Sequence, residues 1–129
     1  MGLQDDTLAI VELTARYNQV IDGGFADRVE EVFTPDARFS SPAHDVERQG
    51  TAEIAEMALG STGHFVHVTT NNIITVDGDN AEQHCTLMLF ALSPDGAATL
   101  SRVGWYDDQL VRAADGWRFT ARAVSFPNM

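Results

Sequence analysis

Two histidines, His64 and His67, open an apolar segment in the middle of the chain and are the side chains best suited to move protons near neutral pH. An imidazole can accept a proton and later return it, as general acid–base catalysis requires. Because the two histidines are three residues apart, a regular strand would point them to opposite faces. The residues alone leave open which of them lines a pocket, and either position also suits a surface or hydrogen-bonded histidine.

Asp22 and Tyr106 are further side chains that could take part in proton chemistry. Asp22 follows the apolar end of a helical segment, where the helix macrodipole disfavours a carboxylate, so its position indicates that another group holds it there. Tyr106 alternates with Gly104 and Asp108 on one face of a strand. Its phenol could donate a hydrogen bond to a substrate carbonyl or enolate oxygen, or it could cover the sheet core.

Several classes of function are disfavoured by composition. The net charge of −11, from 8 basic and 19 acidic residues, argues against binding to nucleic acid or to anionic lipid. The 4 histidines lack ligand spacing such as H-x-x-x-H, so we expect no metal site. The single cysteine, Cys85, lies in an apolar run and is expected to fill the core. No apolar leader opens the chain and no run approaches the roughly 18 apolar residues of a membrane span, so we expect a cytoplasmic protein.

The elements that must position these residues are helical first and strand-rich afterwards. With 129 residues, of which 44% are hydrophobic, the chain can bury one core and is expected to form a single domain over residues 1–129. The first helix is predicted from Asp5 or Asp6, ending at Gly23-Gly24. A short helix over 27–33 closes at Thr34-Pro35, a strand covers 37–41, residues 42–50 are irregular, and a helix over 51–59 begins at Thr51 and ends at Gly60.

Four long β-type runs make up the second half of the chain. Turn signals at Asp77-Gly78-Asp79 and at Asp115-Gly116 separate them into antiparallel hairpins. Helices followed by hairpins predict an α+β protein with the helices on one sheet face. The predicted strands cover residues 65–76, 81–92, 99–112 and 117–126.

The order of these elements and motifs resembles the SnoaL-like, NTF2-like superfamily over nearly the whole chain. The motifs that carry the resemblance are FTPDARF, HVTTN at 67–71, VDGDNA at 76–81 and GWYDDQLVRAADGWRFTAR at 104–122. The resemblance implies an NTF2-like cone, in which N-terminal helices pack over the concave face of a curved antiparallel sheet. It also implies a homodimer that pairs through the outer sheet face, near Trp105.

Two enzymes of this superfamily, scytalone dehydratase and lindane dehydrochlorinase, carry an Asp just past the first helix and a His at the start of a long strand. The matching residues are Asp22 and His67, and the resemblance therefore favours His67 over His64. The spacing of His67 and Asn71 is similar to that of the dehydrochlorinase. By similarity to the dehydratase, Tyr106 and its face look inward.

Ketosteroid isomerase, another member, is similar at Tyr17, which matches its tyrosine oxyanion donor. Its catalytic Asp, however, falls where this chain has Ser41, so steroid-type isomerisation is not expected.

The resemblance thus implies a cofactor-independent lyase or isomerase that acts on a small, mostly apolar cyclic substrate. In this hypothesis Asp22 orients His67, His67 moves the proton, and Tyr17 or Tyr106 holds the oxygen; elimination of the dehydratase type is preferred. A polyketide cyclase, an epoxide-opening enzyme and a non-catalytic ligand-binding or dimerisation domain are the alternatives. Neither a cofactor nor a metal is expected. The residues expected to contact the substrate are Ser41, Phe39, Asn71, Phe90 and Asp108.

Overall fold

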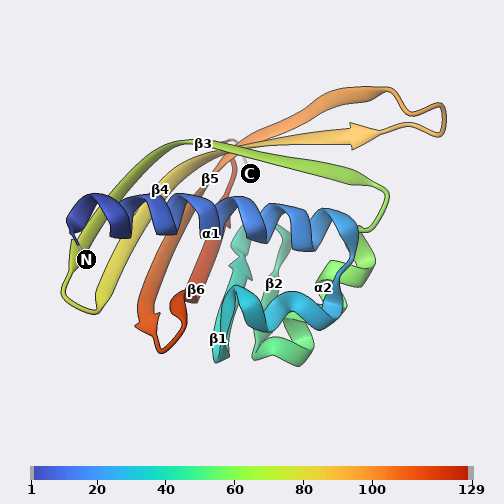
Figure 1. The fold of residues 1–129 in the computed structure, drawn as a ribbon. Helices are drawn as coiled ribbons and strands as arrows, with labels where there is room; N and C mark the ends of the chain where they lie inside the picture. The colour runs from blue at the N-terminus through green and yellow to red at the C-terminus, as the bar shows by residue number, and fades with distance from the viewer. Residues whose placement is uncertain (1, 128–129) are drawn as a thin grey trace.

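The computed structural model describes residues 2–127, in which helices cover one face of a curved six-stranded sheet (Figure 1). The helical elements are α1 (Leu3–Gly23), η1 (Ala26–Glu31), η2 (Pro42–His44) and α2 (Thr51–Ser61). The strands are β1 (Phe33–Ser41), β2 (Val46–Gln49), β3 (Phe65–Asp77), β4 (Asn80–Leu92), β5 (Ala98–Ala113) and β6 (Gly116–Ser125).

The sheet has the strand order β2-β1-β6-β5-β4-β3, and every neighbouring pair is antiparallel except β1–β6. The α+β architecture predicted from the sequence is confirmed, and each end of the four long strands lies within one residue of its predicted position. The parallel β1–β6 pair was not predicted. In this pair, the first strand of the chain lies beside the last one.

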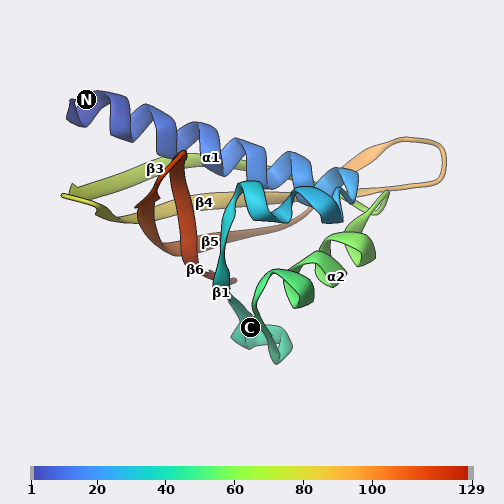
Figure 2. The ribbon, with the colours of Figure 1, turned by 60° about the horizontal axis from the view of Figure 1, so that its bottom comes forward.

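Helix α1 lies along the concave face of the sheet, as two views of the ribbon show (Figures 1 and 2). Its buried side chains recur at helical spacing and pack against inward-facing residues of the strands. Burying an aliphatic or aromatic side chain of this size contributes about 1.5–3 kcal/mol, so this contact is a main source of stability. The helix contributes Ile10, Leu13, Tyr17, Val20 and Ile21, and the strands contribute Leu87, Leu110, Trp117, Phe119 and others.

The end of α1 is set by Gly24, which adopts a left-handed conformation with φ of 66°. A Cβ at this position would lie 1.8 Å from the Thr62 hydroxyl oxygen, so only glycine lets the end of α1 approach the end of α2. This close approach places the last turn of α1, with Asp22, beside the start of β3.

The beginning of α1 is anchored by Asp6, whose side chain is buried under β5 and β6. The Arg112 guanidinium donates to both carboxylate oxygens, at 2.7 and 3.0 Å, and the Trp117 indole donates at 3.3 Å. These bonds, that of Arg112 above all, hold the Asp6 pKa below its ordinary value of 3.8. The ionised carboxylate of Asp6 therefore stabilises the folded state.

We expect the Asp6→Asn variant to be less stable than the wild type at pH 7, and the difference to shrink in acid. Because folding lowers the Asp6 pKa, its stabilising effect is present above the unfolded-state value and is lost as the pH falls through the folded-state value. Urea unfolding of both proteins between pH 7 and pH 3 measures this directly. Asp27→Asn, at an exposed position, is the control. If the difference in unfolding free energy between the wild type and Asp6→Asn stayed constant below pH 4, ionised Asp6 would not be the source of the effect.

The stretch between η1 and α2 differs from its prediction. Strand β1 already begins at Phe33 and runs through Thr34-Pro35, because its pairing with β6 is irregular between Phe33 and Arg38 and tolerates a proline there. Residues 42–50, predicted to be irregular, form η2 and β2. Helix α2 continues through Gly60 to Ser61, and Gly50 rather than Thr51 is its N-cap.

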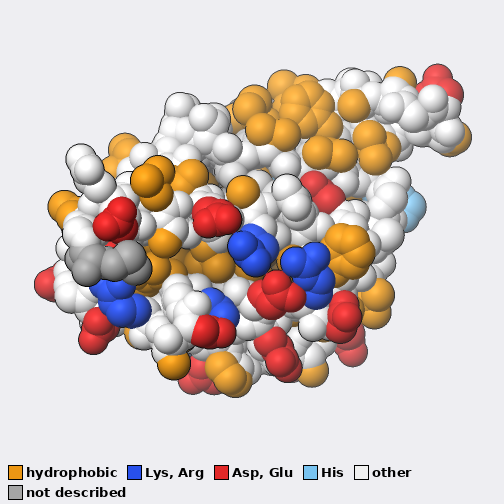
Figure 3. All heavy atoms as spheres, in the orientation of Figure 1, with side chains coloured by type: hydrophobic (Ala, Val, Ile, Leu, Met, Phe, Trp, Pro, Cys, Tyr) orange, Lys and Arg blue, Asp and Glu red, His pale blue; other side chains and the backbone are white. Residues whose placement is uncertain are grey.

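The outer face of the sheet carries exposed apolar side chains, among them Val68, Ile73 and Val103. Figure 3 shows apolar side chains gathered over the end of the sheet where the β4–β5 hairpin projects, while charged side chains of both signs mix over the region around α1. The homodimer expected through the outer face, near Trp105, stays a prediction.

Candidate active site

A pocket of about 230 Å³ lies between the concave face of the sheet and the helices. Its volume is below the range usual for drug-sized ligands, so it favours a compact, single-ring molecule. Apolar side chains form most of its wall, including Ile21, Phe39, Met57, Leu87, Leu89 and Phe126. Its polar side chains are those of Tyr17, Ser41, His44, Arg48, His67 and Tyr106, with Ser61.

Asp22 and His67 form a hydrogen-bonded pair at one side of this pocket. The His67 Nδ1 atom lies 2.6 Å from Asp22 Oδ1, and the two side chains are 12% and 21% exposed. The backbone N–H of His67 also donates to the Asp22 carboxylate oxygens, at 3.1 and 3.0 Å. These bonds explain how a carboxylate is stable in the last turn of α1, where the helix dipole opposes it.

The pairing fixes which nitrogen of His67 can act as a base. Since the Asp22 carboxylate accepts a hydrogen bond from Nδ1, the proton of neutral His67 is on Nδ1 and the lone pair is on Nε2. Within residues 2–127, no hydrogen bond occupies Nε2, although the ring lines the pocket. The pair therefore presents an oriented base to whatever the pocket binds.

Tyr17 from α1 and Tyr106 from β5 line the inner part of the pocket and are both almost completely buried. The ring centroids of the two tyrosines lie 5.8 Å apart in an edge-on arrangement, and that of Tyr17 lies 6.4 Å from that of His67. Burial raises the pKa of both phenols, that of Tyr106 well above its ordinary value. Both remain protonated at neutral pH and are possible hydrogen-bond donors.

A buried ion pair, whose residues do not line the pocket, lies against these two tyrosines. Arg122 donates to Asp108 at 2.8 and 3.2 Å, and both side chains are 0% exposed. The guanidinium carbon lies 3.6 Å from the centroid of the Tyr106 ring and 4.3 Å from that of Tyr17. Gln83 completes the arrangement by donating to Asp108 at 2.9 Å.

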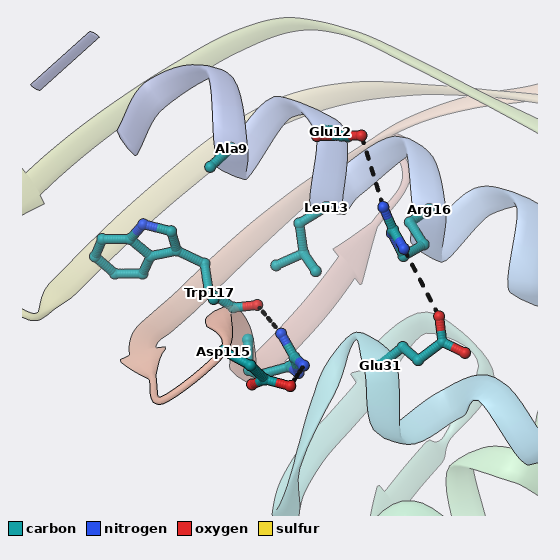
Figure 4. Close-up of a pocket in the computed structure, with 9 residues that line it drawn as sticks. Ala9, Glu12, Leu13, Arg16, Glu31, Asp115 and Trp117 are labelled. Atoms are coloured by element: carbon teal, nitrogen blue, oxygen red, sulfur yellow. Dashed lines mark hydrogen bonds and ion pairs between the residues drawn. The ribbon is translucent and has the colours of Figure 1, made fainter. Parts of the chain in front are cut away.

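A second, larger hollow of about 400 Å³ lies between α1, η1 and the β5–β6 turn (Figure 4). The residues that line it form exposed ion pairs, such as Arg16 with Glu12 at 3.6 Å and with Glu31 at 3.7 Å. It contains no oriented base, and its charged groups already satisfy each other in solvent. The chemistry therefore points to the smaller apolar pocket.

A family model described as a SnoaL-like domain matches residues 4–123 of the chain. This chain belongs to the SnoaL-like family. An uncharacterized protein of Mycobacterium tuberculosis is 33% identical over 123 residues, which are 91% of this chain and 82% of that protein.

Solved structures support the same fold. An NTF2-like protein with a cystatin-like fold from Novosphingobium aromaticivorans is 26% identical, with a TM-score of 0.85, over 98% of this chain and 84% of that one. A protein named as a candidate aromatic ring hydroxylase from the same organism is 27% identical, with a TM-score of 0.84, over 100% of this chain and 94% of that one. The predicted SnoaL-like, NTF2-like membership is confirmed.

Most of the residues proposed for the site from the sequence of this SnoaL-like protein meet in the one pocket. Tyr17, Phe39, Ser41, His67 and Tyr106 all line it, and Asp22 lies behind His67. His64 is exposed in the turn before β3, so the choice of His67 agrees with the geometry.

Three proposed substrate contacts do not reach the pocket. Asn71 is exposed at a bulge in β3, where its φ of 55° breaks the alternation of the strand. Phe90 follows the pocket residue Leu89 and, by alternation, points to the other face. Asp108 faces inward as expected, but it is buried and its carboxylate accepts hydrogen bonds from Arg122.

Sequence reasoning gave no role to Arg48 or to His44, which is exposed in the structure. Both line the pocket, and both come from the stretch that was expected to be irregular. Cys85 is buried beside Arg122 as core filler, as predicted, and burial raises its pKa to about 11. Within residues 2–127, no group of three or more His, Cys, Asp or Glu side chains could hold a metal ion. No helix in this range is long and apolar enough to cross a membrane.

Proposed function

We propose that this SnoaL-like protein is a cofactor-independent lyase of the dehydratase type, acting on a small cyclic substrate in the pocket around His67. The observation that carries the proposal is the 2.6 Å contact between Asp22 and His67, which leaves Nε2 as an available base in an otherwise apolar pocket. The name of the ring hydroxylase relative, which refers to aromatic rings, supports a ring-shaped ligand.

The reaction follows from the arrangement of these groups. His67 Nε2 takes a proton from the carbon beside a substrate carbonyl, which gives an enolate. The electron pair of the enolate then forms the new carbon–carbon double bond as the bond to a β-hydroxyl breaks. The imidazolium then returns the proton to the departing oxygen, which leaves as water. Asp22 stabilises the imidazolium between these two steps. Tyr17 or Tyr106, as a neutral phenol, donates a hydrogen bond to the enolate oxygen.

The proposal is tested with a panel of single-ring compounds: β-hydroxy ketones, halogenated cyclohexanes and cyclic epoxides. We expect dialysed protein, in the presence of a chelator, to convert a cyclic β-hydroxy ketone to the conjugated enone, followed by ultraviolet absorbance and product NMR. Opening of the epoxides alone would instead support the epoxide-opening alternative. Saturable binding across the panel without conversion would contradict the lyase proposal and support a ligand-binding domain.

A further inference from the structure

Arg48 places a guanidinium in the pocket from strand β2. Its partner in the β1–β2 register is Phe39, and Ser41 is paired with Val46 two residues further along. Phe39, Ser41, Val46 and Arg48 all line the pocket, so this short pair of strands presents one continuous face to it. The opposite face of the same strands carries Arg38, which forms an ion pair with Glu47.

The chain has eight basic residues, all of them arginines, and Arg48 differs from the other seven. Six of them form ion pairs with carboxylates, and Arg102 donates to His44. The Arg48 Nε atom is buried and, within residues 2–127, has no hydrogen-bond partner. Arg122 also has a buried nitrogen without a partner, Nη1, but its charge is paired with that of Asp108. A buried, charged donor without a hydrogen-bond partner loses its hydration without compensation, which is unfavourable in free energy. A ligand that offers an acceptor to Arg48 Nε would therefore gain binding energy from this contact.

Ser41 provides a second donor that lacks an acceptor. The Arg102 guanidinium can only donate, so His44 accepts from it through Nε2 and carries its own proton on Nδ1. That Nδ1–H therefore donates to the Ser41 oxygen, 2.9 Å away. The Ser41 hydroxyl proton has no other partner within residues 2–127, and its side chain is buried and lines the pocket. This donor is independent of Arg48 and faces the same space.

The charge of the pocket has the opposite sign to that of the protein. The chain has a net charge of −11, yet none of the described residues that line the pocket is acidic. The carboxylate of Asp22, behind His67, already accepts hydrogen bonds from the backbone N–H and the ring of His67. A ligand that satisfies this lining has an apolar body and an anionic oxygen group.

We propose that the pocket selects small cyclic carboxylates, and that Arg48 is the residue that determines this specificity. The two oxygens of the ligand carboxylate accept hydrogen bonds from Nε and a terminal nitrogen of Arg48, which is the bidentate geometry of arginine–carboxylate pairs. One of these oxygens also accepts a hydrogen bond from the Ser41 hydroxyl. The ring then lies against the apolar wall. This inference rests on the proposed function for the reaction at His67, but its test measures binding alone.

The test compares cyclohexanecarboxylate with its neutral analogue, cyclohexanecarboxamide, by calorimetric titration at pH 7.5. We expect the wild type to bind the carboxylate about 10- to 100-fold more tightly than the amide, which is the usual gain from charge-assisted hydrogen bonds. Arg48→Gln removes this preference. Arg38→Gln is the matched control, because it makes the same change of charge on the other face of the same strands. The titrations measure binding without turnover, which separates this inference from the proposed catalysis.

Three results would overturn the inference: no binding of cyclohexanecarboxylate, equal affinity for the acid and the amide, or a preference that survives in Arg48→Gln. The comparison of acid with amide in the wild type needs no variant, so the inference stays testable even if Arg48→Gln folds poorly. Amide chemical shifts of the pocket residues locate the binding. If the wild type turned over no compound of the lyase panel but still preferred the acid to the amide, this inference would stand and the proposed function would be refuted.

Discussion

Replacing His67 by glutamine is expected to lower turnover on the active compounds of the lyase panel by about 10²–10⁴-fold, the usual contribution of a positioned acid–base group. The side chain of His67 is 12% exposed and lines the pocket, and its Nδ1 is held by Asp22 at 2.6 Å. Glutamine keeps a polar side chain of similar length but cannot accept and return a proton. Initial rates at saturating substrate, on protein whose fold is verified by circular dichroism, give the comparison.

The chain supplies a matched control for this experiment in His64. It lies three residues earlier and is exposed in a turn, so His64→Gln makes the same chemical change away from the pocket. We expect its turnover to equal that of the wild type. Wild-type turnover in His67→Gln, or an equal loss in both variants, would refute the assignment of His67 as the base.

Asp22→Asn separates the orienting role of the carboxylate from the presence of the base. An amide at this position can donate to the imidazole and favour the tautomer with its proton on Nε2, which removes the available lone pair. We therefore expect turnover to fall while the pocket keeps its shape. Imidazole ¹H–¹⁵N correlation spectra should show the proton of neutral His67 on Nδ1 in the wild type and on Nε2 in Asp22→Asn.

The strand-rich half of the fold was predictable because its signals are local. Asp77-Gly78-Asp79 and Asp115-Gly116 mark tight turns, and the runs between them are long enough to define strands without tertiary information. β2 gives no such signal, because Val46–Gln49 is a short, polar segment. It is a strand only because it pairs with β1, and Gly50 donates back to the Ala37 carbonyl at 2.7 Å.

The site was predictable only in part, because most of its residues come together through tertiary structure and not through local patterns. Asp22 and His67 are 45 residues apart, and no local pattern links them; the family resemblance did so. The resemblance also suggested Asn71, but a bulge turns that residue away from the pocket. Arg48 was missed because its role depends on the lack of a partner, which is a property of the folded chain and not of the residue type.

The buried pair of Arg122 and Asp108 is expected to give the largest stability effect in the protein. Both side chains are 0% exposed, so Asp108→Leu leaves a guanidinium without its carboxylate in the core. We expect the free energy of unfolding to fall by about 3–5 kcal/mol, measured by urea denaturation. Asp107→Leu is the control on the same strand: Asp107 pairs with His84 on the outer face, where it is 64% exposed, and its loss should stay within about 0.5 kcal/mol.

The double variant Asp108→Leu with Arg122→Met then shows why the pair is kept. Two apolar side chains of suitable volume can replace a buried ion pair at little cost, so the double variant should be more stable than Asp108→Leu alone. The Arg122 guanidinium also lies 3.6 Å from the centroid of the Tyr106 ring, and its charge favours negative charge that develops beside the two phenols. We therefore expect the double variant to recover stability but not turnover. Recovery of both would mean that the pair serves folding alone, and an effect of Asp108→Leu no larger than that of Asp107→Leu would contradict its burial.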